Sequence, residues 1–476
     1  MKKIAVLLLI VLLASLIACA NTSDTPANKT SPTETYELSL TDIYPYPSHN
    51  FGGAEINFIA LKSGYWGQDY EDITVEQMDG EVLNDAVYNR TSVVEDKYNV
   101  TIKVTYNSAA IDTVVKSILA DDDEYQVIQD KLMYLQSNMA TKNYLYDLTE
   151  VDSVTLEAPW YNQNIIKDLS LGKKVFVLGG DMTISDKAGV MVTVFNKKIA
   201  VDYDVEDLYQ TVREGKWTLD KLHELAILTS KDLNGDGKMV NADDQWGLMA
   251  EDLAAWALLV GFGHRLADLD SDGIPYISVG GEKFLNDLDK VMDIIYNKNI
   301  RAAGSSENYM DNFLNNRNFI QVQAMSTIFS FRVMEEDFGI IPFPKFDEKQ
   351  TAHISTLSPW VTRCFAMPTT NRDPEMVGAV IDAMSRESTE TVMPAYYENV
   401  INNKIARDEE SVEMLKLIYA SVVYDLGSVY NWGNLWFFHQ SFIAGGTREY
   451  VSKFAAVEDK IISEMEETIE AMMDYE

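Results

Sequence analysis

The chain is poor in cysteine and in positive charge. Its 476 residues include two cysteines, Cys19 and Cys364, too few for the disulfide framework of a small secreted domain. Lysine and arginine number 39, against 74 aspartate and glutamate residues, which gives a net charge of −35. No run of basic residues interrupts this excess of acid. A nucleic acid is therefore excluded as the main partner, because the overall field would repel a polyanion.

Compact catalytic signatures are also missing. The sequence has no H-E-x-x-H pair, no G-x-S-x-G and no glycine-rich phosphate loop, and its 5 histidines are scattered. A glycosidase, however, needs only two carboxylates a few ångströms apart, and 74 acidic residues offer such a pair by chance. The sequence therefore favours a protein that is not an enzyme, and a secreted glycoside-processing enzyme stays as an alternative.

Apolar residues, by contrast, are plentiful. They make up 46% of the chain, with 11% aromatic residues, so large cores can form and disorder of the whole chain is excluded. The length suits two or three domains. Strand patterns at 56–61 and 100–105 alternate with a helical pattern at 84–98, and Asp373 and Pro374 begin another predicted helix. This alternation predicts an α/β fold, with helices covering sheets.

The amino terminus has the pattern of an export signal. A basic start at residues 1–3 is followed by an apolar run, Ile4–Ile17, which is too short for an ordinary membrane span. Leu16-Ile17-Ala18-Cys19 resembles the lipobox of bacterial lipoproteins. We expect a signal peptide over 1–18, lipid on Cys19 and a flexible tether over 19–50. A plain signal peptide with an incidental cysteine is the alternative.

One acidic loop has the spacing of a calcium site. Calcium prefers oxygen ligands on a tightly turned loop, and a glycine at the sixth position permits the turn. Asp243 takes the twelfth position, usually a glutamate, and a polar turn without metal is the alternative. A second run, Asp268 to Gly273, has no acid at its twelfth position and predicts a hairpin turn instead. The predicted structural calcium ligands are Asp232, Asn234, Asp236 and Asp243 by side chain and Lys238 by carbonyl.

Short motifs spread over most of the chain carry a family resemblance. In order they are Trp160-Tyr161-Asn162, Gly172-Lys173-Lys174-Val175-Phe176, Val194-Phe195-Asn196-Lys197, Gly215-Lys216-Trp217-Thr218, Gln245-Trp246-Gly247-Leu248, Phe338-Gly339-Ile340-Ile341-Pro342 and Phe365-Ala366-Met367-Pro368. Together with the lipobox, they resemble the extracellular solute-binding proteins of ABC transporters, sugar-binding family 1, which includes maltose-binding-like members.

The resemblance implies a periplasmic-binding-protein fold of the type II kind. Two α/β lobes would be joined by a multi-strand hinge, with ligand in the cleft between them. Lobe one would comprise 51–193 and 321–366, and lobe two 194–320 and 367–476. No organic cofactor is implied.

The same resemblance implies a function and a location. The chain would be a monomer held by its lipid on the extracellular face of the bacterial cytoplasmic membrane. It would capture a carbohydrate, an oligosaccharide, and deliver it to an ABC transporter permease. A peptide or another solute is the alternative ligand.

Aromatic and polar side chains of four segments are expected to face the cleft. The apolar face of a sugar ring packs on tryptophan or tyrosine, and its hydroxyls need carboxylates and amides. Each aromatic residue alone fits a core position equally well. Replacing Trp160 or Trp432 by alanine is expected to weaken ligand binding without unfolding the chain. The predicted ligand-binding residues are Tyr65, Trp66, Asp69, Asp130, Lys131, Trp160, Tyr161, Asn162, Tyr430, Trp432 and Trp436.

Overall fold

The computed structural model describes residues 40–62, 71–302, 306–402 and 405–473. It separates residues 1–47 from residues 48–476 as two units. In the first unit the described structure is a short helix, α2 (Leu40–Ile43). Among the described residues no helix is long and apolar enough to cross a membrane. The predicted signal peptide and the lipidation site Cys19 lie outside the described residues.

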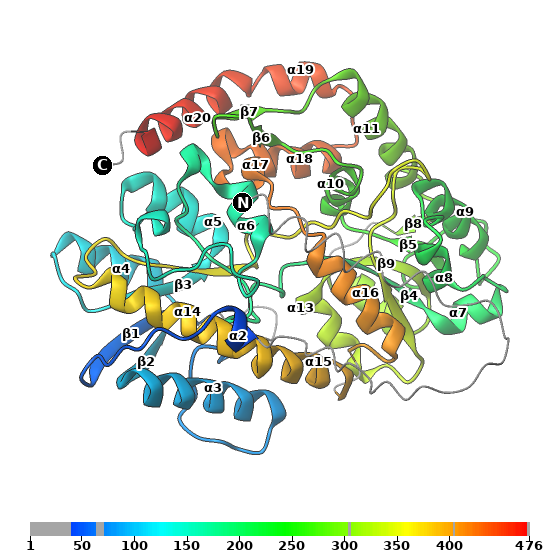
Figure 1. Ribbon diagram of the computed structural model, residues 1–476. Helices are drawn as coiled ribbons and strands as arrows, with labels where there is room; N and C mark the ends of the chain where they lie inside the picture. The colour runs from blue at the N-terminus through cyan, green and yellow to red at the C-terminus, as the bar shows by residue number, and fades with distance from the viewer. Residues whose placement is uncertain (1–39, 63–70, 303–305, 403–404, 474–476) are drawn as a thin grey trace, which may run out of the picture. The chain divides into compact units, whose positions relative to one another are not determined.

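The first sheet of the second unit has four strands. They are β1 (Ala54–Leu61), β2 (Val100–Asn107), β3 (Val127–Lys131) and β11 (Arg363–Ala366), in the order β11-β3-β1-β2. β1 runs parallel to β2 and β3, whereas β11 runs antiparallel to β3 (Figure 1). The helices α14 (Pro374–Glu390) and α15 (Val392–Asn402) pack against α3 (Val82–Tyr98), which contacts β2.

The second sheet has five strands. They are β4 (Met191–Asn196), β5 (Trp246–Met249), β8 (Arg301–Ala302), β9 (Asn318–Ala324) and β10 (Phe338–Ile341), in the order β10-β4-β9-β5-β8. All six residues of β4 are buried, as expected for a strand with a neighbour on each side. α9 (Leu219–Thr229) packs on β5 and β9, and α16 (Glu409–Ala420) packs on β10. The mixed sheets with covering helices confirm the predicted α/β class.

Side chains cap two of the helices, and a short hairpin forms where the sequence predicts a turn. Thr218 caps α9 by accepting the Lys221 N–H, and the Asp373 side chain caps α14 by accepting the Met376 N–H. β6 (Ala267–Leu269) and β7 (Pro275–Ile277) form the predicted hairpin, and Gly273 supplies the left-handed residue of its turn. The other longer helices are α4 (Ala110–Leu119), α6 (Gln163–Leu169), α8 (Leu208–Arg213), α10 (Asp252–Gly261), α11 (Glu282–Ile295), α12 (Ser306–Leu314), α18 (Leu435–Ala444), α19 (Tyr450–Ala455) and α20 (Glu458–Met473).

The sheets divide the chain differently from the predicted lobe boundaries. β9 and β10 lie in the second sheet, although 321–366 was expected in lobe one. α14 follows residue 366 but packs on α3 beside the first sheet, although 367–476 was expected in lobe two. The physical reason is strand pairing, because β4 holds β9 on one side and β10 on the other.

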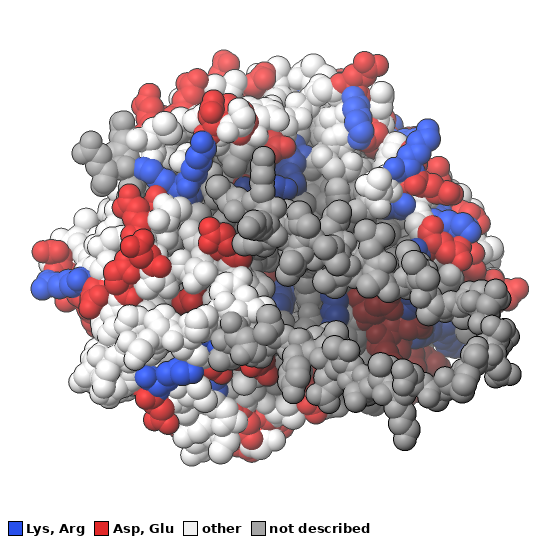
Figure 2. All heavy atoms as spheres, viewed as in Figure 1, with Lys and Arg blue, Asp and Glu red and all other residues white. Residues whose placement is uncertain are grey.

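Figure 2 shows acidic side chains spread over the visible described surface, with basic ones between them.

Candidate functional site

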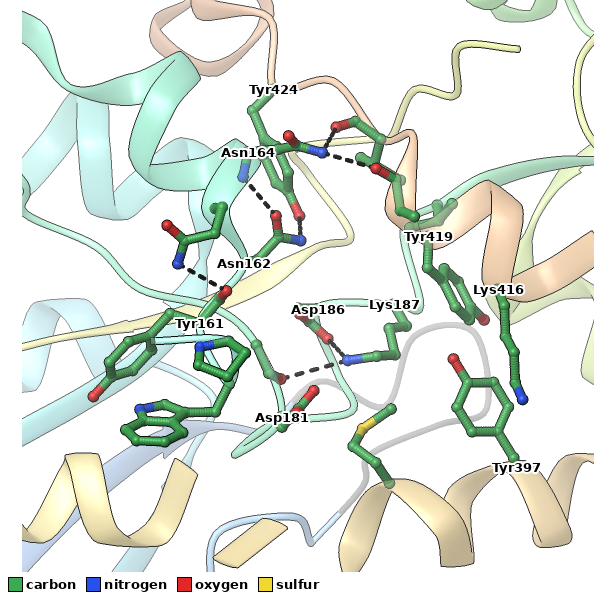
Figure 3. Close-up of a pocket in the computed structure, with 18 residues that line it drawn as sticks. Tyr161, Asn162, Asn164, Asp181, Asp186, Lys187, Tyr397, Lys416, Tyr419 and Tyr424 are labelled. Carbon is green, nitrogen blue, oxygen red and sulfur yellow. Dashed lines mark hydrogen bonds and ion pairs between the residues drawn. The ribbon is translucent and has the colours of Figure 1, made fainter. Parts of the chain in front are cut away.

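A cavity of about 360 Å³ lies beside the first turn of α6 (Figure 3). Two chain segments, 159–164 and 180–190, form one wall. The other wall comes from α15, from α16 and from the residues that follow α16. Because α15 packs on α3 beside the first sheet and α16 packs on β10 of the second, both halves of the fold contribute to this cavity. Its lining includes Trp160, Tyr161, Asn162, Asp181, Asp186, Lys187, Tyr397, Lys416, Tyr419 and Tyr424.

Asparagine side chains hold the first wall to the second. Asn162 caps α6 by accepting the Asn164 N–H at 3.0 Å, and its amide donates to the Tyr424 hydroxyl at 3.0 Å. The Asn164 amide donates to the Ala420 and Val422 carbonyls at 3.2 and 2.9 Å. The start of α6 is therefore tied to the chain just after α16.

The second wall presents tyrosine rings and one lysine. The Tyr419 hydroxyl lies 2.9 Å from that of Tyr396, which is buried beneath it. The Lys416 ammonium lies 5.4 Å from the centre of the Tyr397 ring. In the described part of the chain, neither the Tyr397 hydroxyl nor the Lys416 ammonium has a hydrogen-bond partner. Both groups are thus available to a ligand.

The floor of the cavity carries a buried ion pair. Lys187 donates to the Asp186 carboxylate at 2.9 Å and to the Gly180 and Thr183 carbonyls at 3.4 and 3.3 Å. Burial opposes the charge of Lys187, but the carboxylates of Asp186 and Asp181 outweigh it and raise the pKa of this lysine. Burial raises the pKa of Asp186 to about 6, although Lys187 opposes this. The pair is therefore held in place by charge and by hydrogen bonds together.

Asp181 is the carboxylate with an open oxygen. One of its oxygens accepts the Thr389 hydroxyl at 2.8 Å, and the other has no partner among the described residues. Burial raises its pKa, and Lys187 opposes the rise. The cavity therefore combines aromatic faces with an open carboxylate oxygen, a hydroxyl and an ammonium. This set of groups suits a polyhydroxylated ring, which has an apolar face and a polar rim.

Three predicted ligand-binding residues line this cavity, but two of them are buried. Trp160 and Tyr161 are 1% and 2% exposed. Their polar atoms donate to the Asp382 carboxylate on α14, the Trp160 indole at 3.2 Å and the Tyr161 hydroxyl at 3.1 Å. These two side chains shape the wall and are held from behind, whereas Asn162 is half-buried at the cavity.

The structure places the predicted cluster near the carboxyl terminus in the core. Tyr430, Trp432 and Trp436 are 5%, 2% and 4% exposed and do not line the cavity. The Tyr430 and Trp432 rings stack with centres 4.9 Å apart, and the Trp432 indole donates to the Thr468 hydroxyl at 2.8 Å. These three side chains therefore occupy core positions, which the sequence had left as the alternative to ligand binding.

The other predicted segments lie apart from the cavity or outside the described residues. Asp130 is 2% exposed and Lys131 is half-buried at the end of β3. Tyr65, Trp66 and Asp69 lie outside the described residues. Sequence reasoning missed the residues from α15 and α16 because they share no motif with the first wall. The one local signal was the pair of adjacent tyrosines, 396 and 397.

Side chains of the predicted calcium loop accept hydrogen bonds from the loop's own backbone. Asp232 accepts the N–H groups of Gly235 and Gly237, at 2.6 and 2.8 Å. Asn234 and Asp236 accept the N–H groups two residues further on, both through Oδ1. Asp244, not Asp243, turns its carboxylate toward the loop and accepts the N–H groups of Leu233 and Val240. Asp243 itself is exposed.

Acidic residues alone do not make this a metal centre. Across the described ranges, no group of three or more His, Cys, Asp or Glu side chains is placed to hold a metal ion. Calcium ligation by Asp232, Asn234, Asp236, Lys238 and Asp243 therefore stays a prediction.

Calcium is expected to raise the melting temperature of the wild-type chain and not that of Asp232→Ala. A ligand that binds only the folded state stabilises it by about 2.7 kcal/mol at a hundred times its Kd. Asp268→Ala in the hairpin run is the matched control and should respond like wild type. Equal melting temperatures with calcium and with a chelator, for wild type, would contradict the calcium site.

No protein-family model matches the chain, and no curated protein matches it in sequence. Solved structures do match it. A cyclo/maltodextrin-binding protein complexed with maltotetraose has a TM-score of 0.58 at 13% identity, covering 88% of this chain and 99% of that one. UspC of M. tuberculosis has a TM-score of 0.57 at 8% identity, covering 86% and 100%. The maltose/maltodextrin-binding domain MalE of Bdellovibrio bacteriovorus, bound to maltotriose, has a TM-score of 0.50 at 14% identity, covering 88% of this chain and 100% of that one. At these identities the similarity establishes the fold alone: the chain has the two-lobed fold of maltodextrin-binding and other sugar-binding ABC solute-binding proteins.

Proposed function

We propose that this protein is the substrate-binding component of an ABC importer. It captures a carbohydrate, an oligosaccharide, in the cavity between α6, α15 and α16 and delivers it to a membrane permease. It is held on the outer face of the cytoplasmic membrane by lipid on Cys19, and it acts as a monomer.

The observation that carries this proposal is the composition of the cavity. Tyrosine rings stand beside an open carboxylate oxygen of Asp181, the Tyr397 hydroxyl and the Lys416 ammonium. A sugar ring uses both kinds of surface at once, because its C–H face packs on aromatic rings while its hydroxyls form hydrogen bonds. The similar structures solved with maltotetraose and maltotriose support the same ligand class.

Capture would work through closure. Tyr397 belongs to the half of the fold that carries the first sheet, and Lys416 to the half that carries the second. A ligand that contacts both halves is bound better when they are close together, so it shifts the population toward the closed form. The closed form is then the state that a permease can distinguish from the empty one.

An enzyme is the weaker candidate. A glycosidase needs one carboxyl group as acid and a second as base or nucleophile. Two carboxylates line the cavity, those of Asp181 and Asp186. Asp186 forms an ion pair with Lys187, so Asp181 is the open carboxylate of the two. The structures that share the fold are also sugar-binding transport proteins.

The testing experiment is a thermal-shift screen of the full chain against a library of oligosaccharides, followed by product analysis. A native-state ligand must raise the melting temperature. We expect a rise with particular oligosaccharides and no new sugar products. A rise accompanied by cleavage would favour the enzyme. No rise with any sugar, but a rise with peptides, would replace the carbohydrate by a peptide.

Within this site, Asp181→Asn is expected to weaken binding of the sugar found in the screen about ten- to a hundredfold. A hydrogen bond to a charged acceptor contributes about 1.5 to 3 kcal/mol, and the amide also presents a donor where an acceptor is needed. Calorimetric titration measures the change. Asp202→Asn, on the exposed surface of α7 (Lys197–Asp202), removes the same charge and should bind like wild type. Equal affinities for wild type and Asp181→Asn would remove Asp181 from the site.

A further inference from the structure

A second aromatic group lies at the end of β3. Trp360, in the loop before β11, is 39% exposed, which is unusual for the largest side chain in a well-packed chain. The Tyr134 ring meets it edge-on, with centres 5.2 Å apart and planes at 72°. The Lys131 ammonium lies 4.0 Å from the centre of the Trp360 ring and 5.3 Å from that of Tyr134. We call Lys131, Tyr134 and Trp360 the platform.

The backbone holds the platform in place. The Leu132 N–H donates to the Thr362 carbonyl at 2.9 Å, and the Met133 N–H donates to the Pro359 carbonyl at 3.2 Å. The loop that carries Trp360 is therefore fastened to the segment that carries Lys131 and Tyr134. The platform is a built feature of the fold rather than a chance contact between loose side chains.

Lys131 has no carboxylate partner within the described ranges. This is notable in a chain with 74 acidic residues, where Lys103, Lys187, Lys197 and Lys283 each pair with a carboxylate. Its neighbour Asp130 is 2% exposed, and that carboxylate accepts the backbone N–H of Lys131 at 2.6 Å instead of its ammonium.

The ammonium of Lys131 is also partly removed from water. Burial lowers its pKa, with Asp130 opposing the shift and Arg363 adding to it. Arg363 stands opposite Lys131 in the β3–β11 register, so a second positive charge is close by. A desolvated cation beside another cation gains most from an anion brought by a ligand.

Backbone contacts connect the loop that carries Trp360 to the segment 179–190, part of which lines the cavity. The Ser358 N–H donates to the Gly189 carbonyl at 2.9 Å, and Leu357 forms a β-bridge with Val190, which lines the cavity. At the other end of this segment, a Cβ added to Gly179 would lie 3.5 Å from the Cys364 sulfur. Cys364 on β11 stands opposite Asp130 on β3.

We propose that the platform binds a sugar ring that carries a negative charge, so that the captured carbohydrate is an acidic oligosaccharide. The exposed indole of Trp360 packs against the ring, and the Lys131 ammonium pairs with its carboxylate or sulfate. This inference rests on the proposed function and names its substrate class. Because the net charge of −35 disfavours an anion at long range, the Lys131 ammonium supplies the local attraction that such a ligand needs.

Calorimetric titration of the full chain tests the inference with matched ligands. The probes are oligogalacturonate, a sulfated galactan oligosaccharide and the neutral galactan oligosaccharide of equal length. We expect one of the two acidic probes to bind about ten- to a hundredfold more tightly than the neutral one, and more weakly as salt rises. The preference between the two acidic probes identifies carboxylate or sulfate as the recognised group.

Three variants place this preference on the platform. Lys131→Gln should lose the advantage of the acidic probe and keep binding of the neutral one, whereas Lys131→Arg should restore the advantage. Trp360→Ala should weaken both probes. Lys198→Gln, an exposed lysine on α7 with the same charge change, should behave like wild type. Unaltered preference in Lys131→Gln would overturn the inference.

Failure of the inference and failure of the proposed function give different results. If neutral sugars bind and acidic ones do not bind better, the chain is a sugar-binding protein and the platform inference is wrong. If neither these probes nor any member of the oligosaccharide library binds, the proposed function is wrong and the inference falls with it.

Discussion

Replacing Asp72 by alanine is expected to lower the free energy of unfolding by about 3 to 5 kcal/mol, because it leaves a buried charge without its partner. Asp72 is fully buried. One carboxylate oxygen accepts the N–H groups of Ile184 and Ser185 and the Ser185 hydroxyl, at 2.9, 3.1 and 2.8 Å. The other oxygen accepts the Gln129 amide at 3.1 Å.

The unpaired charge would be that of Arg90. This guanidinium is buried on α3 and donates to the Asp72 and Ile73 carbonyls at 2.8 and 2.7 Å. Burial lowers the pKa of Arg90 to about 10, and the Asp72 charge opposes the fall. Removing that carboxylate therefore costs both its hydrogen bonds and the compensation of this cation.

Urea unfolding measures the expected loss. Asp96→Ala, at an exposed position on the same helix as Arg90, is the control and should change the stability by less than about 0.5 kcal/mol. A change below about 1 kcal/mol in Asp72→Ala would contradict the description of this network. Since Asp72 holds residues 184 and 185 beside the cavity floor, the surviving folded fraction should also bind its sugar more weakly.

Trp432→Ala is expected to destabilise the chain by about 3 to 5 kcal/mol without changing the ligand affinity of the folded protein. A buried tryptophan removed from a close-packed core leaves a cavity, and its loss costs this much. Here the change also removes the stack on Tyr430 and leaves the Thr468 hydroxyl without the indole donor. The sequence alone predicted the opposite pattern, with weaker binding and an intact fold.

Thermal unfolding together with calorimetric titration separates the two patterns. Trp432→Phe keeps most of the apolar volume and should recover much of the stability. A variant that melts like wild type but binds sugar more weakly would return Trp432 to the ligand site. Trp160 is buried and also lines the cavity. Trp160→Ala should therefore lower both the stability of the chain and its affinity for the sugar.

Much of the fold could be predicted because its strands and helix starts are locally encoded. The pattern at 100–105 predicted β2, which runs two residues further, and the pattern at 84–98 predicted most of α3. Thr218 and Asp373 cap helices through hydrogen bonds to residues three positions further on. These features depend on contacts between close neighbours in sequence, so a single sequence contains them.

Features that depend on distant partners were predicted less well. Residues 174–178 have strand composition but form no strand among those described; Leu178 makes only a bridge to Phe365. The region 449–472 forms two helices, α19 and α20, and not one. The membership of β9 and β10 in the second sheet depends on pairing with β4, more than 120 residues away from the start of β9.

The candidate site shows the same limit. The motif Trp160-Tyr161-Asn162 lies on one wall of the cavity, but aromatic composition does not distinguish a buried ring from an open one. Tyr397 and Lys416 come from helices whose patterns predict only packing. Their role in the cavity arises because α15 and α16 meet there, which is a property of the folded chain.

The most direct test of the central claim, that the cavity holds a sugar, is calorimetric titration with the oligosaccharide that gives the largest thermal shift. The account predicts saturable binding by wild type at one site, a loss of about ten- to a hundredfold in Asp181→Asn and wild-type binding by Asp202→Asn. Binding that is equal in all three chains would place the sugar elsewhere. The absence of a binding oligosaccharide would contradict the account as a whole.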